Sequence, residues 1–174
     1  MELLSKAEID DLLQIARSAI EKRDVVTSPI RKTIGLFVTL KVDEQMRGCM
    51  GDPFPTKPLD QLVKECALAA CQDSRYDLIT EDEIARLMIE LSLITPPKTI
   101  QRDEIEVGRH GLIIEKGLIL PQVAKEQRWD VPTFIKNVCR KAGLLEGAWQ
   151  RSTKLLGFEA EVFRTEIRVA CHSR

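Results

Sequence analysis

The sequence predicts a mixed α+β protein whose sheets are mainly antiparallel. Two apolar runs flank a Lys116-Gly117 dipeptide, an arrangement typical of a β-hairpin. Several other short runs alternate apolar and polar residues, and segments with helical spacing and capping signals lie between them. Hairpins beside helices favour this class over a doubly wound parallel sheet.

The composition is that of one ordinary globular domain, residues 1–174, with 44% hydrophobic and 30% charged side chains. A net charge of −1 disfavours nucleic-acid binding through bulk charge, although a local basic patch stays open. The acidic first residues and the lack of an apolar run of about 18 residues argue against a leader peptide and a membrane helix, so we expect a cytoplasmic protein. Five cysteines without a C-x-x-C pair predict reduced thiols, and we predict no metal and no cofactor.

The first half of the chain predicts a helix, a strand and a second helix. A capping box at Ser5–Glu8 opens a helix from about Lys6 to Glu21. Alternation from Leu36 to Val42 predicts a strand, and Asp43–Gln45 predict a turn. The second helix runs from about Leu59 to Gln72.

The second half predicts a strand, a hairpin, two helices and a last strand. A capping box at Thr80–Glu83 opens a short helix, and the strand Leu87–Ile94 stops at Pro96-Pro97. The hairpin occupies residues between Gly108 and Leu120. The remaining signals are Pro121 at the start of a helix to about Arg128, Asp130 as the cap of the next helix, Gly143 as its end, and a strand around Phe158–Val162.

The segment Met46–Gly51 combines a cation, a thiol and two glycines directly after a predicted strand. We expect it to form a tight bend that is open to solvent. A thiolate beside an arginine can be stabilised electrostatically, and glycine-rich backbone can turn its N–H groups toward an anion. The alternative is a close-packed bend with a buried structural thiol.

Six segments match one family pattern in order, between about residues 35 and 163. They are Met46-Arg47-Gly48-Cys49-Met50-Gly51, Asp73-Ser74-Arg75-Tyr76, Glu90-Leu91-Ser92-Leu93 with Pro96, Gly108-Arg109-His110-Gly111-Leu112, Leu120-Pro121-Gln122-Val123-Ala124 with Trp129, and Cys139-Arg140-Lys141-Ala142-Gly143-Leu144 with Trp149. Together they resemble the AMMECR-domain family, whose signature is L-R-G-C-I-G. The chain departs from it in the methionines that flank Gly48-Cys49 and in Asp77-Leu78, where the family often has prolines.

The resemblance implies an α+β fold in two unequal lobes, with interleaved sub-lobes an option, and no established reaction. Some members of the family are fused to, or encoded beside, a Memo-like protein and a radical S-adenosylmethionine enzyme, which implies a modification pathway and such partners. Whether the chain is an enzyme, a non-catalytic adaptor or, more weakly, an RNA-binding factor stays open. Its ligand would be a small molecule or a terminal polar group.

The candidate catalytic residues are Cys49, as a nucleophile, and His110, as its general acid or base. The alternatives are a buried structural cysteine and a surface histidine with one backbone hydrogen bond. Arg47 and Arg75 are candidate anion clamps, but each could instead form an ion pair with Asp73 or Glu90, which we favour for Arg75.

Four further residues complete the candidate ligand site. Gly48 and Gly51 would let backbone approach a ligand, and Glu90 faces either solvent or a cleft. The Gln122 amide either binds a ligand or caps a helix. Outside this site, Trp129 either stacks on a base or, as we prefer, packs between elements. We expect 168–174 to be a disordered tail.

Overall fold

The computed structural model describes residues 3–145 and 154–165. Its contacts divide the chain into two compact units, which we call the first unit (Met1–Leu93 with Glu161–Arg174) and the second unit (Ile94–Ala160). Strand β3, Leu87–Ile94, and strand β7, Leu155–Arg164, each continue from one unit into the other. The predicted α+β class with antiparallel pairing is confirmed.

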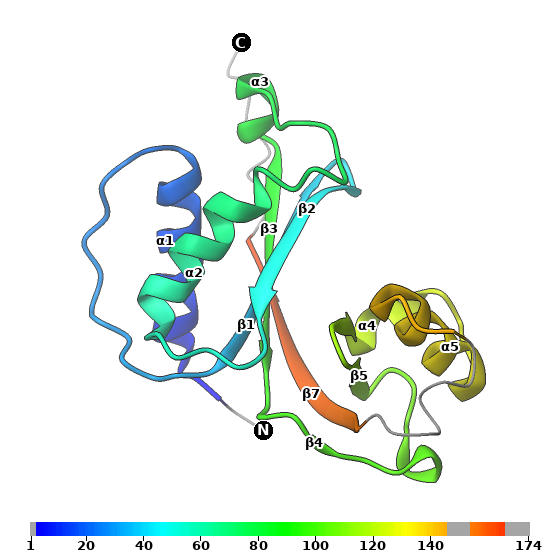
Figure 1. Ribbon diagram of the computed structural model, residues 1–174. Helices are drawn as coiled ribbons and strands as arrows, with labels where there is room; N and C mark the ends of the chain where they lie inside the picture. The colour runs from blue at the N-terminus through cyan, green and yellow to red at the C-terminus, as the bar shows by residue number, and fades with distance from the viewer. Residues whose placement is uncertain (1–2, 146–153, 166–174) are drawn as a thin grey trace. The chain divides into compact units, whose positions relative to one another are not determined.

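The first unit contains a sheet in the order β2-β1-β3-β7, so β2 is its edge strand (Figure 1). Strands β1 (Gly35–Val42) and β2 (Gln45–Asp52) form a hairpin. The two residues between them, Asp43 and Glu44, have φ values of 50° and 64°. Positive φ at both positions is the backbone of a tight turn that suits the twist of the paired strands.

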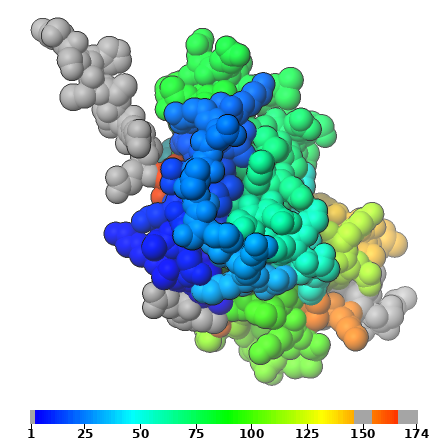
Figure 2. All heavy atoms as spheres, turned by 90° about the vertical axis from the view of Figure 1, so that its left-hand side faces the viewer, coloured from blue at the N-terminus to red at the C-terminus, as the bar shows by residue number. Residues whose placement is uncertain are grey.

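Two helices, α1 (Lys6–Ile20) and α2 (Leu59–Ala70), lie side by side on one face of this sheet (Figure 1). Figure 2 shows the outer surface that they form with the segment 21–34. The predicted capping box of α1 is present, because Glu8 N–H donates to Ser5 Oγ and Ser5 N–H donates to Glu8 Oε2. The predicted short helix is α3, Glu81–Ile84.

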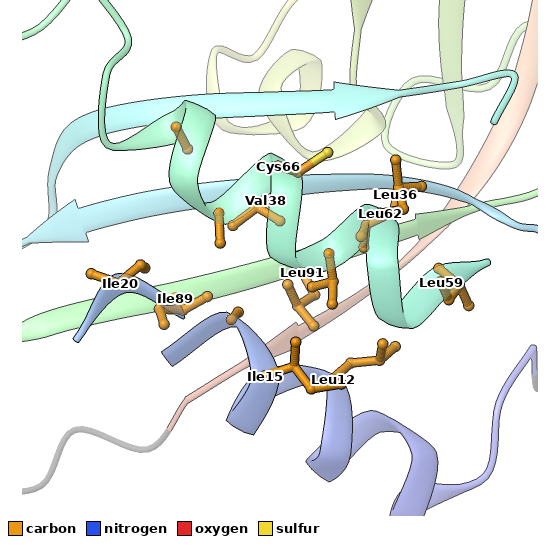
Figure 3. Close-up of a cluster of buried hydrophobic side chains, with 14 of the residues drawn as sticks. Leu12, Ile15, Ile20, Leu36, Val38, Leu59, Leu62, Cys66, Ile89 and Leu91 are labelled. Atoms are coloured by element: carbon orange, nitrogen blue, oxygen red, sulfur yellow. The ribbon is translucent and has the colours of Figure 1, made fainter. Parts of the chain in front are cut away.

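The core of the first unit lies between these helices and one face of β1 and β3. Leu12 of α1, Leu62 of α2, Val38 of β1 and Leu91 of β3 are all buried there (Figure 3). Each such side chain contributes about 1.5–3 kcal/mol by leaving water. Because strand side chains alternate, the residues between them on β1 and β3 point to the opposite face. That face carries polar side chains: Thr39, Lys41, Glu90 and Ser92.

The second unit contains the order β6-β5-β7, with β4 paired to the other edge of β7. Asp130 caps α5 by accepting a hydrogen bond from Thr133 N–H at 2.9 Å, and Gly143 ends it with φ of 74°. Its core contains Phe134 and Leu112, both fully buried. The elements are β4 (Lys98–Thr99), η1 (Arg102–Glu104), β5 (His110–Ile114), β6 (Gly117–Ile119), α4 (Pro121–Glu126) and α5 (Val131–Ala142).

Two local expectations were wrong. Residues Arg47–Gly51 form no bend but continue as β2, because the chain has already turned at Asp43 and Glu44. The turn of the second hairpin consists of Glu115 and Lys116, since Gly117 already pairs with Ile114. Trp149, the tail 168–174 and the tail residues Cys171 and His172 lie outside the described residues. Of the helices described, none is both long enough and apolar enough to span a bilayer.

Candidate functional site

The structure distributes the predicted site residues over both units. Six of them lie in the first unit: Arg47, Gly48, Cys49, Gly51, Arg75 and Glu90. His110 and Gln122 lie in the second unit.

The two glycines of the Met46–Gly51 segment are required by close packing rather than by positive φ. A Cβ atom at Gly48 would lie 1.9 Å from the carbonyl oxygen of Ala70, at the end of α2. A Cβ atom at Gly51 would lie 2.3 Å from the carbonyl oxygen of Leu36 and equally close to the Phe37 ring. Gly48 therefore brings α2 against β2, and Gly51 brings the Phe37 ring over the strand.

Arg47 is the extra residue of a β-bulge. Leu40 pairs with Gly48 and Lys41 pairs with Met46, so nothing on β1 is opposite Arg47. A bulge breaks the alternation of side chains and redirects the residue that it contains. Arg47 Nη2 donates to Glu83 Oε1 of α3 at 2.5 Å, so the ion-pair alternative for Arg47 is realised with Glu83 rather than Asp73 or Glu90.

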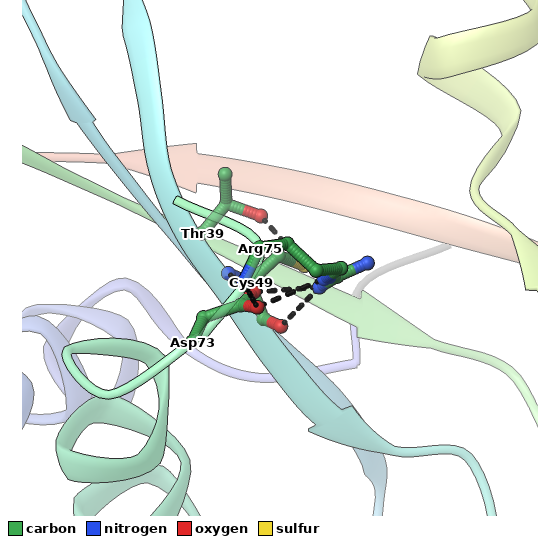
Figure 4. A network of polar contacts seen from close by, with 4 residues as sticks. All are labelled: Thr39, Cys49, Asp73 and Arg75. Atoms are coloured by element: carbon green, nitrogen blue, oxygen red, sulfur yellow. Dashed lines mark hydrogen bonds and ion pairs between the residues drawn. The ribbon is translucent and has the colours of Figure 1, made fainter. Parts of the chain in front are cut away.

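Cys49 is half-buried and lies opposite Thr39 of β1. Thr39 Oγ1 donates a hydrogen bond to Cys49 Sγ at 3.3 Å (Figure 4). Thr39 itself is only 4% exposed. The thiol is therefore held by a hydroxyl donor that is fixed in the sheet.

The backbone of Cys49 is bound by a pair of side chains from the loop after α2. Its N–H donates to Asp73 Oδ2 at 3.0 Å, and its carbonyl oxygen accepts from Arg75 Nη2 at 3.1 Å (Figure 4). Both groups point to the free edge of β2. Asp73 and Arg75 thus take the place of a neighbouring strand and block that edge against strand pairing.

Asp73 and Arg75 also bind each other, as favoured from the sequence. Arg75 Nε donates to Asp73 Oδ1 at 2.8 Å and Arg75 Nη2 donates to Asp73 Oδ2 at 2.6 Å. Hydrogen bonds from the Arg75 side chain and from Cys49 N–H hold the pKa of the buried Asp73 carboxyl well below its usual range. The hydrogen bonds and charge of Asp73 in turn raise the pKa of Arg75.

Glu90 is buried rather than open to solvent, with 3% of its surface exposed. Its Oε2 lies 3.6 Å from Lys41 Nζ of β1 and accepts from Arg164 Nε of β7 at 2.8 Å. Glu90 therefore joins three strands of the first unit by ion pairs. Neither cation was singled out from the sequence.

His110 begins β5 and accepts a hydrogen bond from Glu106 N–H to its Nδ1 at 3.0 Å. This is the backbone contact of the simpler alternative for this residue, and it assigns the proton of the neutral ring to Nε2. Gln122 follows Pro121 in the first turn of α4 and is half-buried. Trp129 packs near Phe134, with ring centroids 6.4 Å apart, which is the preferred packing role.

The other described thiols differ from Cys49 in their surroundings. Burial raises the pKa of Cys66 to about 11 and raises those of Cys71 and Cys139. In the described ranges, no three His, Cys, Asp or Glu side chains are grouped as metal ligands would be. A cavity of about 920 Å³ in the first unit is bounded by α1, the segment after it, the start of β3 and the end of β7, where Arg164 lines it. None of the site residues predicted from the sequence lines this cavity.

Thr39, Lys41 and Arg164 are the site residues that sequence reasoning missed. A signal for Thr39 and Lys41 was present, because both are polar and alternate with the apolar residues of β1. The position of Thr39 opposite Cys49 and the ion pair of Lys41 with Glu90 depend on how the strands are arranged, which the sequence did not reveal. Arg164 carries no local signal at all, since it comes from a strand 74 residues after Glu90.

Comparison with known proteins identifies the class. The family model described as AMMECR1 matches residues 12–163, and the chain belongs to this family. Its relatives include a protein of Methanothermobacter thermautotrophicus, 36% identical over 94% of this chain and 97% of that one. A protein of Thermococcus onnurineus is 38% identical over 94% of this chain and 87% of its own.

A solved structure supports the same assignment. The crystal structure of an uncharacterised protein from Pyrococcus horikoshii is similar to this chain with a TM-score of 0.82 and 34% identity. The similarity covers 90% of each chain. This chain is thus similar to archaeal proteins over nearly its whole length. The family resemblance inferred from the motifs is confirmed.

Proposed function

We propose that the first unit carries a group-transfer site in which the Cys49 thiol is the nucleophile. One arrangement carries this proposal: Thr39 donates to the half-buried sulfur while Arg75 binds the carbonyl oxygen of the same residue. A hydroxyl donor and a nearby cation both favour a thiolate, and reactive cysteines occupy partly exposed, electropositive surroundings. Burial raises the pKa values of the other described thiols, Cys66, Cys71 and Cys139, and so disfavours their thiolate forms.

The chemistry is acyl, alkyl or thiol transfer. The sulfur attacks an electrophilic carbon, an S–C bond forms, and the leaving group departs with its bonding electron pair and takes up a proton from water. A second nucleophile then removes the group and releases the thiolate. With a disulfide donor the sulfur attacks sulfur and one thiolate leaves, so no outside oxidant is needed. Such chemistry requires a reduced thiol, and a cytoplasmic location would suit that requirement.

Arg75 would select the substrate. Arg75 uses Nε and Nη2 on Asp73 and Cys49, while 54% of its side chain is exposed. Its Nη1 group would serve as the donor for a carboxylate or another terminal polar group. Arg47, which is bound to Glu83, would act by fixing the bulge beside the thiol.

The test is covalent capture on the native full chain. A small thioester, iodoacetamide and a small disulfide are each offered near neutral pH, and the modified residue is identified by mass spectrometry. We expect an adduct on Cys49, its loss in Cys49→Ser and its retention in Cys71→Ser. Modification spread equally over Cys49 and Cys71 with all three reagents would remove the basis of the proposal.

A second candidate function is that of a non-catalytic adaptor, and exposed apolar side chains favour it. Met46 and Met50 on β2 are 36% and 39% exposed, and Phe54 just after it is 55% exposed. Large exposed apolar side chains gathered on one segment are typical of protein-binding surfaces. The partner would be a Memo-like protein or a radical S-adenosylmethionine enzyme, in the modification pathway that the family context implies.

Binding to each purified partner separates the two functions. An adaptor retains its partner in Cys49→Ser and loses it in Met50→Asp, with the exposed Lys64→Met as the control. Partner binding that survives both Met50→Asp and Phe54→Asp would contradict the adaptor.

A further inference from the structure

A second group of ionisable side chains lies on the polar face of the first unit's sheet. Lys41 of β1, Glu90 of β3 and Arg164 of β7 meet at one carboxylate oxygen, Glu90 Oε2. Of these three described side chains, two are cations and one is a carboxylate, so together they have a net charge of +1. Glu90 is 3% exposed as a residue and the Lys41 side chain is 15% exposed, so this pair is largely removed from water, whereas the Arg164 side chain is 50% exposed.

A cation as little exposed as Lys41 is costly unless an anion balances it, and the Glu90 carboxylate beside Lys41 is shared with Arg164. Lys41 Nζ lies 3.6 Å from Glu90 Oε2, which is beyond ordinary hydrogen-bond distance. Within the described part of the chain, Arg164 contacts the carboxylate through Nε alone. Its two Nη groups, on a side chain that is 50% exposed, form the planar fork that binds carboxylate or phosphate through two hydrogen bonds.

We propose that Lys41 and Arg164 form an oxyanion-binding site, which takes a carboxylate or phosphate group of a ligand beside Glu90. Glu90 acts as the internal anion that holds the two cations in position when the ligand is absent. The bound oxyanion accepts from Lys41 Nζ and from the Nη groups of Arg164. The site depends on neither the Cys49 thiol nor its reactivity.

Titration of the native full chain with inorganic phosphate and with acetate at low ionic strength tests this site. The heat of binding is measured for wild type, Lys41→Met and Arg164→Gln. We expect each substitution to weaken binding of the better anion about tenfold or more, because a charge-assisted hydrogen bond is lost. The exposed Lys64→Met and Arg31→Gln are matched controls that keep the wild-type affinity. The ratio of the two affinities tells which oxyanion the site prefers.

Glu90→Gln should change the anion affinity in the opposite direction. Without the internal anion the two cations should bind the added oxyanion more tightly, whereas a merely structural ion-pair group would give no binding to strengthen. If this variant does not fold, Lys41→Met and Arg164→Gln decide alone. Three outcomes would each overturn the site. The first is weaker anion binding by folded Glu90→Gln, and the second is equal affinity of wild type, Lys41→Met and Arg164→Gln. The third is no binding of either anion by the wild type. Cys49→Ser keeps the wild-type affinity, so failure of this site is distinguishable from failure of the thiol proposal.

Discussion

Cys49 N–H donates to Asp73 Oδ2 at 3.0 Å and so ties the edge strand β2 to the loop that follows α2. The two residues are 24 positions apart in the sequence. Arg75 completes the contact by binding both the Asp73 carboxylate and the Cys49 carbonyl oxygen. Cys49 is therefore held by hydrogen bonds at three of its groups: the backbone N–H, the backbone carbonyl oxygen and, through Thr39, the sulfur.

Replacing Asp73 with Asn should destabilise the fold. The substitution removes the charge that Arg75 pairs with and leaves a buried amide in its place. We expect a loss of about 2–3 kcal/mol in the free energy of unfolding, measured in urea. Asp77→Asn, at an exposed neighbouring carboxylate, is the control and should change it by less than about 0.5 kcal/mol.

The difference in stability between wild type and Asp73→Asn should depend on pH in the acid range. Because the pKa of Asp73 is lowered in the folded state, its stabilisation is fully present above the unfolded value, about 3.9, and is lost as the pH falls through the folded value. The gap in stability between wild type and Asp73→Asn should thus be constant above pH of about 5 and shrink below about 4. A gap that widens on acidification would show that the carboxylate is not the stabilising form.

Burial of Cys66 predicts a change at the alkaline end. Its pKa is raised to about 11, so the unfolded chain releases this proton first and the folded state loses stability between the unfolded pKa and about 11. Relative to Cys66→Ala, wild type should lose on the order of 2 kcal/mol over this range. Urea unfolding at a series of alkaline pH values measures the difference, and parallel curves for the two proteins would contradict it.

Gly48→Ala should be far more costly than its single methyl group suggests. The new Cβ would meet the Ala70 carbonyl oxygen at 1.9 Å, so α2 and β2 would have to separate. We expect a loss of about 2–3 kcal/mol or more. Gly143→Ala is an instructive control, since no atom lies within 4 Å of its Cβ and only its φ of 74° is unfavourable. It should cost about 1 kcal/mol, and equal losses would refute the packing argument.

Thr39→Val should slow the alkylation of Cys49 without unfolding the protein. The substitution keeps the β-branched shape and removes the hydroxyl that donates to the sulfur. We expect the rate to fall about threefold to tenfold, from the loss of one hydrogen bond to the thiolate. Thr33→Val, at an exposed position, should leave the rate unchanged. An unchanged rate in Thr39→Val as well would mean that the hydroxyl only fills space.

Much of the fold was predictable because its signals are local. The Ser5–Glu8 capping box, the Asp130 cap and the Gly143 terminus each depend on residues within one helical turn. In the strand Leu87–Ile94 the pattern of side chains is clear enough to predict both of its ends. Strand β2 was missed because two of its eight positions are glycine and its bulge interrupts the alternation at Arg47.

The site was only partly predictable, since its contacts connect distant segments. The sequence marked Cys49, Arg75 and Glu90, and it suggested the ion pair of Arg75 with Asp73. Nothing local indicates that Thr39 lies opposite Cys49 or that Arg164 reaches Glu90, because both follow from strand pairing. The bulge, likewise, appears only once the register of β1 and β2 is known.

The rate of alkylation of Cys49 relative to Cys71 in the native protein tests the central claim most directly. Iodoacetamide is added near neutral pH, and the two rate constants are followed by mass spectrometry in the same sample, with a small free thiol as reference. An activated Cys49 should react faster than both Cys71 and the free thiol. If Cys49 reacts no faster than either, its hydroxyl donor and its arginine do not activate it, and the thiol is structural.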